Sequence, residues 1–259
     1  MKRIHLFEFE DQQWFPVFLR NYVTDFLQFL SNKAKVYKPI IEVIHTTLSK
    51  NDTKNIIDLG SGSGGGLLWL SNELKKANPG LRILLTDFYP NTAAFEYIKK
   101  QSDIFSYYTD PVDAKNVPGD LIGLRTQFLS FHHFRPEEGK MIVQNAVDAQ
   151  QPIAIFEIQD RSISSLITML FSPISVLIMT PFIQPFRIGR LVFTYLIPVV
   201  PIVVLWDGMV SCLRTYSVDE MKALIDSIDN KESYDWKFDK KKSKTGFVIY
   251  MTGTPYLKH

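Results

Sequence analysis

The first 50 residues carry apolar side chains at helical spacing. Between residues 17 and 31, large apolar residues recur every three or four positions, which is typical of an amphipathic helix with one buried face. These residues are Phe18, Leu19, Tyr22, Val23, Phe26, Leu27 and Leu30. A second helix is predicted over residues 39 to 49. We expect both helices to precede the main fold.

From residue 55 onward, short apolar strands alternate with helical segments. Strands are predicted at 55–59, 82–86, 104–108, 126–131 and 153–158, and helices at 66–77 and 91–101. A further helix is expected to begin near Pro136, because proline suits the first helical position and Glu137 and Glu138 would lie in the positive first turn. This alternation predicts a parallel sheet covered by helices on both faces.

After Arg161 the pattern changes. Residues 163–186 contain no charged side chain, and residues 191–206 form a second uncharged stretch, with Arg187 and Arg190 between them. The first stretch is long enough for a membrane-spanning helix, but prolines interrupt both stretches. These are Pro173, Pro181, Pro185, Pro198 and Pro201. We expect short helices forming an apolar cap over a pocket or at a membrane interface; a dimer contact and a true membrane hairpin are the alternatives.

Regular structure is predicted to resume at Ser217. Ser217 and Glu220 have the spacing of a capping box ahead of a helix that ends near Asp229. Strands at 234–238 and 246–252 follow, and the lysine-rich run 239–244 between them is interpreted as a solvated hairpin loop. Asp207 is expected to pair with Arg214; alternatively, the segment 206–208, with Arg214 and Tyr216, lines the rim of the pocket.

Composition and charge narrow the class of protein. With 259 residues and 46% apolar content, the chain can bury one large core, and we expect a single domain. Its parts would be an N-terminal helical lid (1–50), a core (52–160), the apolar insertion (161–208) and a C-terminal helix and hairpin (209–259). The 29 basic and 27 acidic residues are well mixed, so no nucleic-acid surface is expected.

Cysteine content and the N-terminal residues bear on location. One cysteine, Cys212, excludes an intramolecular disulfide and fits a reducing compartment. Charged residues among the first ten argue against a secretory leader. We expect the protein in the cytoplasm, or on the cytoplasmic face of a membrane.

A glycine-rich segment follows the first predicted strand, with the sequence Ile-Ile-Asp-Leu-Gly-Ser-Gly-Ser-Gly-Gly-Gly at 56–66. A turn built on Gly60, Gly62 and Gly64 lets the backbone approach a ligand closely, because no Cβ obstructs it and positive φ costs little. Gly60, Gly62 and Gly65 also fit the G-x-G-x-x-G spacing of dinucleotide-binding enzymes, which alone is weak evidence.

Three acidic residues help to identify the cofactor that the glycine turn would hold. Asp58 precedes the first glycine by two positions, where a cationic amino-acid group would favour an acid. Asp87 ends the second strand, where a carboxylate can accept hydrogen bonds from both ribose hydroxyls. Asp113 follows the third strand and is a candidate partner for an adenine amino group. Together they favour a nucleoside cofactor with a cationic amino-acid part.

These segments resemble the class I S-adenosylmethionine-dependent methyltransferase family, nearest to its ubiquinone- and menaquinone-pathway branch. The D-x-G-x-G-x-G motif is matched at residues 58–64, the acid after strand two by Asp87, and a D-A-x-x-x-P loop by Asp113, Ala114 and Pro118. The Phe-His-His-Phe segment 131–134 resembles the family's L-H-H segment. The likeness covers about residues 52–160.

The resemblance implies an α/β fold: a Rossmann-like, seven-stranded methyltransferase sheet whose last strand is antiparallel, with N-terminal helices and, in this chain, an apolar insertion after strand five. It implies S-adenosylmethionine as the cofactor. The predicted cofactor-binding residues are Asp58, Gly60, Ser61, Gly62, Gly64, Asp87, Phe88, Asp113, Ala114 and Ser130. The family usually begins strand four with an aspartate followed by apolar residues, whereas this chain has Arg125-Thr126-Gln127, so the register of that strand stays open.

Methyl transfer requires alignment of the acceptor, exclusion of water and, for some acceptors, removal of a proton. His132 and His133, just beyond strand four, are candidates for the proton step; alternatively they pack the next helix or orient the cofactor. Glu157 is a candidate base or acceptor-orienting group, because burial in its apolar strand would raise its pKa. A salt bridge to Arg161 is the alternative. No metal site is predicted.

The segments around the pocket suggest the acceptor. The N-terminal residues His5, Glu8, Glu10, Asp11 and Trp14 are expected to fold over the pocket as a lid; alternatively, Trp14 and Phe15 anchor the first helix. The apolar insertion beside the pocket favours a hydrophobic acceptor. We therefore predict methyl transfer to a small, lipophilic acceptor. The alternatives are a nicotinamide-dinucleotide oxidoreductase and a non-catalytic, membrane-associated binding protein.

Overall fold

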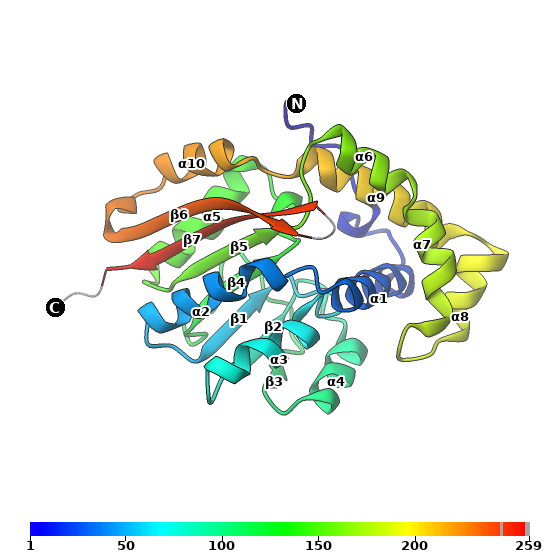
Figure 1. Cartoon of the computed structure of the whole chain (residues 1–259), viewed down its shortest axis with the longest axis horizontal. Helices are drawn as coiled ribbons and strands as arrows, with labels where there is room; N and C mark the ends of the chain where they lie inside the picture. The colour runs from blue at the N-terminus through cyan, green and yellow to red at the C-terminus, as the bar shows by residue number, and fades with distance from the viewer. Residues whose placement is uncertain (244–245, 257–259) are drawn as a thin grey trace.

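The computed structural model describes residues 1–243 and 246–256. Its centre is a seven-stranded sheet with the order β3-β2-β1-β4-β5-β7-β6 (Figure 1). Strands β1 to β5 pair in parallel, and β7 runs antiparallel to both of its neighbours, β5 and β6. The strands are β1 (Asn55–Leu59), β2 (Arg82–Thr86), β3 (Phe105–Tyr107), β4 (Leu124–Phe128), β5 (Ile153–Glu157), β6 (Tyr234–Ser243) and β7 (Gly246–Pro255). The predicted sheet, including its antiparallel last strand, is confirmed.

Helices cover both faces of this sheet. Because successive side chains of a strand point to opposite faces, Ile56 and Ile57 of β1 enter two different apolar cores. Ile56 packs with α2 (Ile41–Lys50), α3 (Leu67–Ala77) and α4 (Thr92–Gln101), whereas Ile57 packs with α5 (Pro136–Asp148) and α10 (Val218–Asp226). The predicted capping box at Ser217 and Glu220 begins α10.

Strand β4 begins two residues before its predicted start and ends three residues before its predicted end. It covers Leu124–Phe128, whereas residues 126–131 were expected. The predicted bounds were displaced because a charged residue, Arg125, lies at the start of the strand. Arg125 is fully buried, and its Nη1 donates to Asn145 Oδ1 on α5 at 2.7 Å. Leu129, with φ of 54°, ends the strand. The next residues form the short helix η3 (Phe131–His133).

The lysine-rich run near the C-terminus belongs to a strand rather than to a loop. Asp239 to Ser243 extend β6, and Lys240 pairs with Ile249 of β7. Because β6 lies at the edge of the sheet, its lysines stay in solvent while the backbone pairs on one side. Lys244, the last residue of the expected loop, lies outside the described residues.

The apolar insertion folds into short helices beside helix α1 (Val17–Ala34), as predicted (Figure 1). They are α6 (Ile163–Leu170), α7 (Ser172–Met179), α8 (Ile188–Leu191) and α9 (Val199–Arg214), with the short turns η4 (Thr180–Phe182) and η5 (Val192–Leu196). Helices α6 and α7 pack on α9. Val176, Ile183 and Val200 form a third apolar core with Leu19 and Val23 of α1.

Among the described residues, no single helix has both the length and the apolarity needed to cross a membrane. Two bent helix pairs reach that threshold when each is taken together: Ile163–Leu170 with Ser172–Phe182, bent by 41°, and Ile188–Leu196 with Val199–Arg214, bent by 78°.

Candidate functional site

The glycine turn lies at the carboxyl edge of the sheet, where the strand order reverses between β1 and β4. Open α/β sheets bind ligands at this switch point. Gly60, Gly62 and Gly64 have φ of +69°, +56° and +86°, which side chains with a Cβ rarely adopt. The backbone N–H of Ser61 donates to Thr86 O at the end of β2 at 2.9 Å. Ser130, after β4, lies against Gly60, where an added Cβ would be 3.2 Å from the Ser130 Cβ.

Asp87 joins the glycine turn to the loop after β3. Its Oδ2 accepts a hydrogen bond from the Gly62 backbone N–H at 2.7 Å, and its Oδ1 accepts one from Tyr89 N–H at 2.7 Å. The backbone N–H of Val112 donates to Asp87 O at 2.9 Å, which places Asp113 beside Asp87. Burial raises the pKa of Asp87, outweighing both backbone donors. Each carboxylate oxygen keeps a further lone pair for a ligand hydroxyl.

Two other predicted cofactor residues occupy contrasting positions. Phe88, next to Asp87, has 51% of its surface exposed, so its ring is free to contact a ligand. Ala114 is buried in the core formed with α5, so only its backbone faces the loop.

Asp58 lies behind the glycine turn rather than in front of it. It is 2% exposed, and its two oxygens accept hydrogen bonds from Ser61 Oγ at 2.6 Å and Thr126 Oγ1 at 2.8 Å. Burial raises its pKa to about 7, against the opposing effect of these two donors. Asp58 therefore joins Ser61 of the turn to Thr126 of β4, and its contact with a cofactor stays a prediction.

Helix α1 holds the glycine turn from the outside, a role that the sequence analysis did not predict. Ser63 Oγ lies 2.7 Å from Thr24 Oγ1 and donates to Asp25 Oδ1 at 2.9 Å. Arg190 of α8 donates to the other oxygen of Asp25 at 2.7 Å. One buried carboxylate thus connects the turn to the apolar insertion. The available signal was a polar residue, Asp25, inside an otherwise apolar helical stripe.

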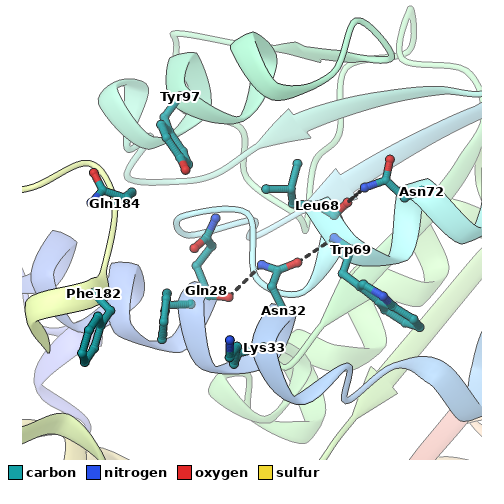
Figure 2. A pocket seen from close by; sticks show the side chains of 10 residues that line it. Gln28, Asn32, Lys33, Leu68, Trp69, Asn72, Tyr97, Phe182 and Gln184 are labelled. Carbon is teal, nitrogen blue, oxygen red and sulfur yellow. Dashed lines mark hydrogen bonds between the residues drawn. The ribbon is translucent and has the colours of Figure 1, made fainter. Parts of the chain in front are cut away.

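Further along α1, Asn32 connects the glycine turn to the first turn of α3. Its side-chain N–H donates to Gly65 O at 2.7 Å, and its Oδ1 accepts from Trp69 N–H at 2.7 Å. A cavity of about 380 Å³ lies beside Asn32. Its lining includes Gln28 and Asn32 of α1, Tyr97 of α4, and Phe182 and Gln184 of the insertion, whose side chains Figure 2 labels. This cavity is lined by none of the predicted cofactor residues.

The histidine pair after β4 meets the end of β5. His132 Nδ1 lies 2.9 Å from Glu157 Oε2, and the His132 backbone N–H donates to Glu157 Oε1 at 3.0 Å. Both side chains are buried, with exposures of 1% and 0%. The alternative pairing of Glu157 with Arg161 is absent, since Arg161 donates both guanidinium N–H groups to Glu220. Glu157 therefore orients the His132 ring.

His133 and its neighbours form a charged cluster with the N-terminal segment. His133 Nδ1 is 2.7 Å from Asp11 Oδ1 and 3.1 Å from Glu8 Oε2. Burial lowers the pKa of His133, but the attraction of Glu8, Asp11 and Glu10 outweighs it and raises this pKa to about 10. Arg214 of α9 adds an ion pair to Asp11 at 2.6 Å. His133 and Arg214 hold the pKa of Asp11 well below its ordinary value despite burial, which acts the other way.

The predicted pairing of Asp207 with Arg214 is wrong. Seven residues separate them on α9, about two helical turns or 10 Å, so each turns to a different part of the N-terminal segment. Asp207 accepts hydrogen bonds from the backbone N–H groups of Phe9 and Glu10 at 2.8 and 3.3 Å. Burial raises the pKa of Asp207 to about 7 and, together with Asp207, raises that of Glu10 well above its usual range.

The N-terminal segment lies over the ends of β4 and β5. Arg3 donates to Phe134 O at 2.8 Å, and Trp206 Nε1 donates to Phe7 O at 2.9 Å. Phe15 is buried at 4% exposure, whereas Trp14 is 66% exposed, so only Phe15 anchors the start of α1. The contacts of Glu8 and Asp11 with His133 were not predicted, because nothing in the sequence pairs these distant residues.

The site therefore has two adjoining parts: a cradle of glycine backbone with Asp87 and Asp113, and a buried histidine–carboxylate cluster roofed by the N-terminal segment. Arg20 connects the two parts, because its Nε donates to Glu10 O at 2.9 Å and its guanidinium lies 4.4 Å from the ring of Tyr89, two residues after Asp87. The cradle can hold a nucleoside, and the cluster can orient or deprotonate a second molecule beside it.

No protein-family model matches the chain, and no curated protein matches it in sequence. Solved structures, in contrast, match the chain in fold. The plantazolicin methyltransferase BpumL in complex with SAH (S-adenosylhomocysteine) is 12% identical, with a TM-score of 0.55 over 93% of this chain and 96% of that one. The methyltransferase domain of bacterial CtHen1-CN is 12% identical, with a TM-score of 0.51 over 85% of this chain and 99% of that one.

A third similar structure is the S-adenosylmethionine-dependent methyltransferase SibL in its apo form. It is 11% identical, with a TM-score of 0.51 over 88% of this chain and 56% of that one. Such likenesses establish the fold, so the chain has the seven-stranded fold of S-adenosylmethionine-dependent methyltransferases. This strand order differs from the all-parallel sheet of dinucleotide-binding dehydrogenases.

Proposed function

We propose that this protein transfers a methyl group from S-adenosylmethionine to a small, lipophilic acceptor. The observation that carries the proposal is the position of Asp87: its carboxylate closes on the glycine turn, and its backbone holds the loop of Asp113 beside it. The fold supports the same cofactor, since similar structures include methyltransferases solved with SAH.

The residues of the cradle fit this cofactor. The free lone pairs of Asp87 would accept the ribose hydroxyls, and Asp113 would face the adenine amino group. The positive-φ glycines leave room for the amino-acid part, with Ser130 closing the side toward β4. The cofactor supplies an electrophilic methyl group. The chain aligns the acceptor, excludes water beneath the N-terminal segment and, through the histidine–carboxylate cluster, orients or accepts an acceptor proton.

Isothermal titration tests the cofactor. We expect S-adenosylmethionine and S-adenosylhomocysteine to bind, and the Asp87→Ala variant to bind both at least about tenfold more weakly, since a lost charge-assisted hydrogen bond costs on the order of 1.5–3 kcal/mol. Asp110→Ala, which removes an exposed acid three residues before Asp113, should bind like wild type.

The other outcomes separate the alternatives. Binding of a nicotinamide dinucleotide without S-adenosylmethionine would replace the methyltransferase proposal by an oxidoreductase. Cofactor binding without release of demethylated product, in the presence of lipid or quinone extracts, would favour a non-catalytic binding protein.

We also propose that the outer face of the insertion binds a membrane surface. Large apolar side chains are half or more exposed along α6, α7 and the following turns. They include Ile163, Ile167, Leu170, Phe171, Ile174, Ile178, Phe182, Phe186, Ile188 and Leu196. An apolar surface this extensive usually marks an interaction site. The opposite face of α7 packs on α1 and α9, and α6 packs on α9.

Two features favour lipid as the occupant. No charged side chain interrupts residues 163–186, so nothing on this face would set the register of a protein partner. Lys33 of α1 lines the same cavity as Phe182 (Figure 2), and a basic group at the rim of an apolar face suits anionic lipid headgroups. A lipophilic acceptor would then reach the site from the membrane. A cytoplasmic face agrees with the buried, unpaired thiol of Cys212.

The resemblance of the motifs to the ubiquinone- and menaquinone-pathway branch adds to this proposal, because it suggests a lipid-soluble acceptor of the same kind. Self-association through the insertion remains the competing arrangement, and the membrane experiment described below distinguishes it.

A further inference from the structure

Three side chains from two distant segments of the chain converge where the N-terminal segment covers the histidine–carboxylate cluster. They are Glu8 of the N-terminal segment and His132 and His133 of η3. One potential ligand atom from each lies within 4.8 Å of the other two. Glu8 and His132 are buried almost completely, at 0% and 1% exposure, and the side chain of His133 is 24% exposed.

His132 is arranged as metal-ligating histidines usually are. Its Nδ1 faces Glu157 Oε2 at 2.9 Å, so Nδ1 carries the proton and the Nε2 lone pair points toward Glu8. Histidine ligands commonly donate their second ring N–H to a carboxylate in this way. Nε2 has no hydrogen-bond partner within the described part of the chain, although the side chain is buried. A buried, oriented and unpartnered nitrogen indicates a missing ligand.

The spacing of the ligand atoms fits a metal ion. Glu8 Oε1 lies 3.9 Å from His132 Nε2, and Glu8 Oε2 lies 3.1 Å from His133 Nδ1. Two ligands of a tetrahedral ion with bonds of about 2.1 Å are about 3.4 Å apart. The two distances involve different oxygens of Glu8, and with one ligand atom from each residue all three atoms lie within 4.8 Å of one another, so side-chain rotations would bring them to one ion.

The charge around these side chains favours a cation as well. Glu8, Asp11 and Glu157 contact the two imidazoles, and Arg214 pairs with Asp11 and Glu8. Buried carboxylates in such excess are costly unless they are protonated or paired with positive charge.

We propose that Glu8, His132 and His133 bind a divalent first-row transition-metal ion, with zinc as the first candidate and Glu157 as the residue that positions His132. Two imidazoles and one carboxylate match three-ligand zinc sites, in which a fourth position stays open for another oxygen. Two nitrogen ligands disfavour Mg²⁺ and Ca²⁺, which prefer oxygen.

Such an ion would fasten the N-terminal segment to the ends of β4 and β5. The fourth coordination position would stay open for an oxygen ligand. If the proposed methyl transfer is correct, an acceptor oxygen can bind there; this role rests on that function, whereas metal binding itself does not.

The experiment uses the full chain without a histidine tag, dialysed against a chelator and then titrated with Zn²⁺ or Co²⁺. We expect one equivalent per chain by elemental mass spectrometry, a visible d–d spectrum with Co²⁺, and a higher melting temperature with metal. Glu8→Gln and His132→Gln should each lose at least about tenfold in affinity. Glu157→Gln should lose about 10- to 100-fold while keeping the one-to-one stoichiometry, as expected for a residue that positions a ligand.

Glu42→Gln is the control, because it neutralises an exposed acid on α2, outside the cluster. It should bind metal like wild type, and circular dichroism checks that every variant is folded. A wild-type chain that binds neither metal, or equal binding by Glu8→Gln and Glu42→Gln, would overturn the proposal. Because the readouts need no cofactor, metal binding without S-adenosylmethionine binding would reject only the methyltransferase proposal.

Discussion

A negative charge on Asp58 is unusually unfavourable for an aspartate, because the side chain is buried. Its two oxygens are satisfied by hydroxyl groups of Ser61 and Thr126, which do not balance a negative charge as an amine or guanidinium would. Burial therefore dominates and raises its pKa to about 7. In the unfolded chain the same carboxyl titrates near 3.9.

This difference predicts how stability depends on pH. The folded state binds the Asp58 proton more tightly, so the stabilisation is complete below about pH 4 and is lost as the pH rises to about 7. Three pKa units set an upper bound of about 4 kcal/mol on this loss. Asp58→Asn mimics the protonated acid, so its free energy of unfolding should fall less than that of wild type between pH 5 and pH 8.

Denaturant unfolding at these two pH values checks the prediction. Asp103→Asn, which neutralises an exposed acid, should keep the wild-type pH dependence. Parallel curves for wild type and Asp58→Asn would show that Asp58 stays ionised across this range and that its hydroxyl partners suffice.

At the scale of elements, the glycine turn depends on close packing as well as on backbone freedom. A Cβ at Gly64 would lie 2.1 Å from Ile98 Cδ1 of α4, a side chain that is fully buried. At the neighbouring Gly65, a Cβ would meet nothing within 4 Å. Both positions have positive φ, so the two glycines differ chiefly in the space around them.

Alanine substitutions at these two positions separate packing from conformation. Gly65→Ala should lose about 1 kcal/mol for the left-handed backbone. Gly64→Ala should lose a further 1–3 kcal/mol, on the order of the cost of overpacking a core. Thermal melting without cofactor measures both. Equal melting temperatures would mean that Ile98 moves aside freely.

The elements that the sequence predicted well are those whose side-chain pattern follows their own geometry. Strands β1 and β2 have the predicted bounds because apolar residues on both faces match a buried parallel strand. Strand β4 was displaced because Arg125 is buried through Asn145, a partner on another element. Strand β6 was predicted too short, because lysines on an edge strand resemble a loop in the sequence although their backbone is paired.

The candidate site divides in the same way. The glycine turn, Asp87 and Asp113 lie within or just after local motifs, so the sequence could bring them together. The pairing of Glu8 and Asp11 with His133, and of Asp25 with Arg190, depends on tertiary contacts between distant segments. No local pattern encodes such contacts, and Asp207 was wrongly paired with Arg214 because the two residues lie close together in the sequence.

Across the whole molecule, α1 connects the apolar insertion to the cofactor cradle. Its apolar face packs on Val176 and Val200 of the insertion, while Thr24 and Asn32 contact the glycine turn. The buried Asp25–Arg190 pair joins the two surfaces at 2.7 Å. Breaking one partner of such a pair is usually costly, so the insertion and the turn should keep a fixed relation. A membrane-bound insertion would then hold the cradle near the lipid surface.

A pair of matched substitutions tests whether the insertion binds lipid. Ile178 of α7 is 63% exposed. Ile122, which is 62% exposed, lies just before β4, at the amino end of that strand, whereas the insertion follows the carboxyl end of β5. Ile178→Asp should reduce sedimentation with anionic liposomes severalfold, because a charge at an apolar interface loses hydration. Ile122→Asp adds the same charge to a comparable side chain outside the insertion, so it should sediment like wild type.

Analytical ultracentrifugation without lipid completes this test, because a dimer through the insertion would also respond to Ile178→Asp. If wild type is monomeric and sediments with liposomes, the apolar face binds lipid. If wild type is dimeric, Ile178→Asp makes it monomeric and neither protein binds liposomes, the face is an interface between two copies. In that case a lipophilic acceptor would have to reach the cradle from solution.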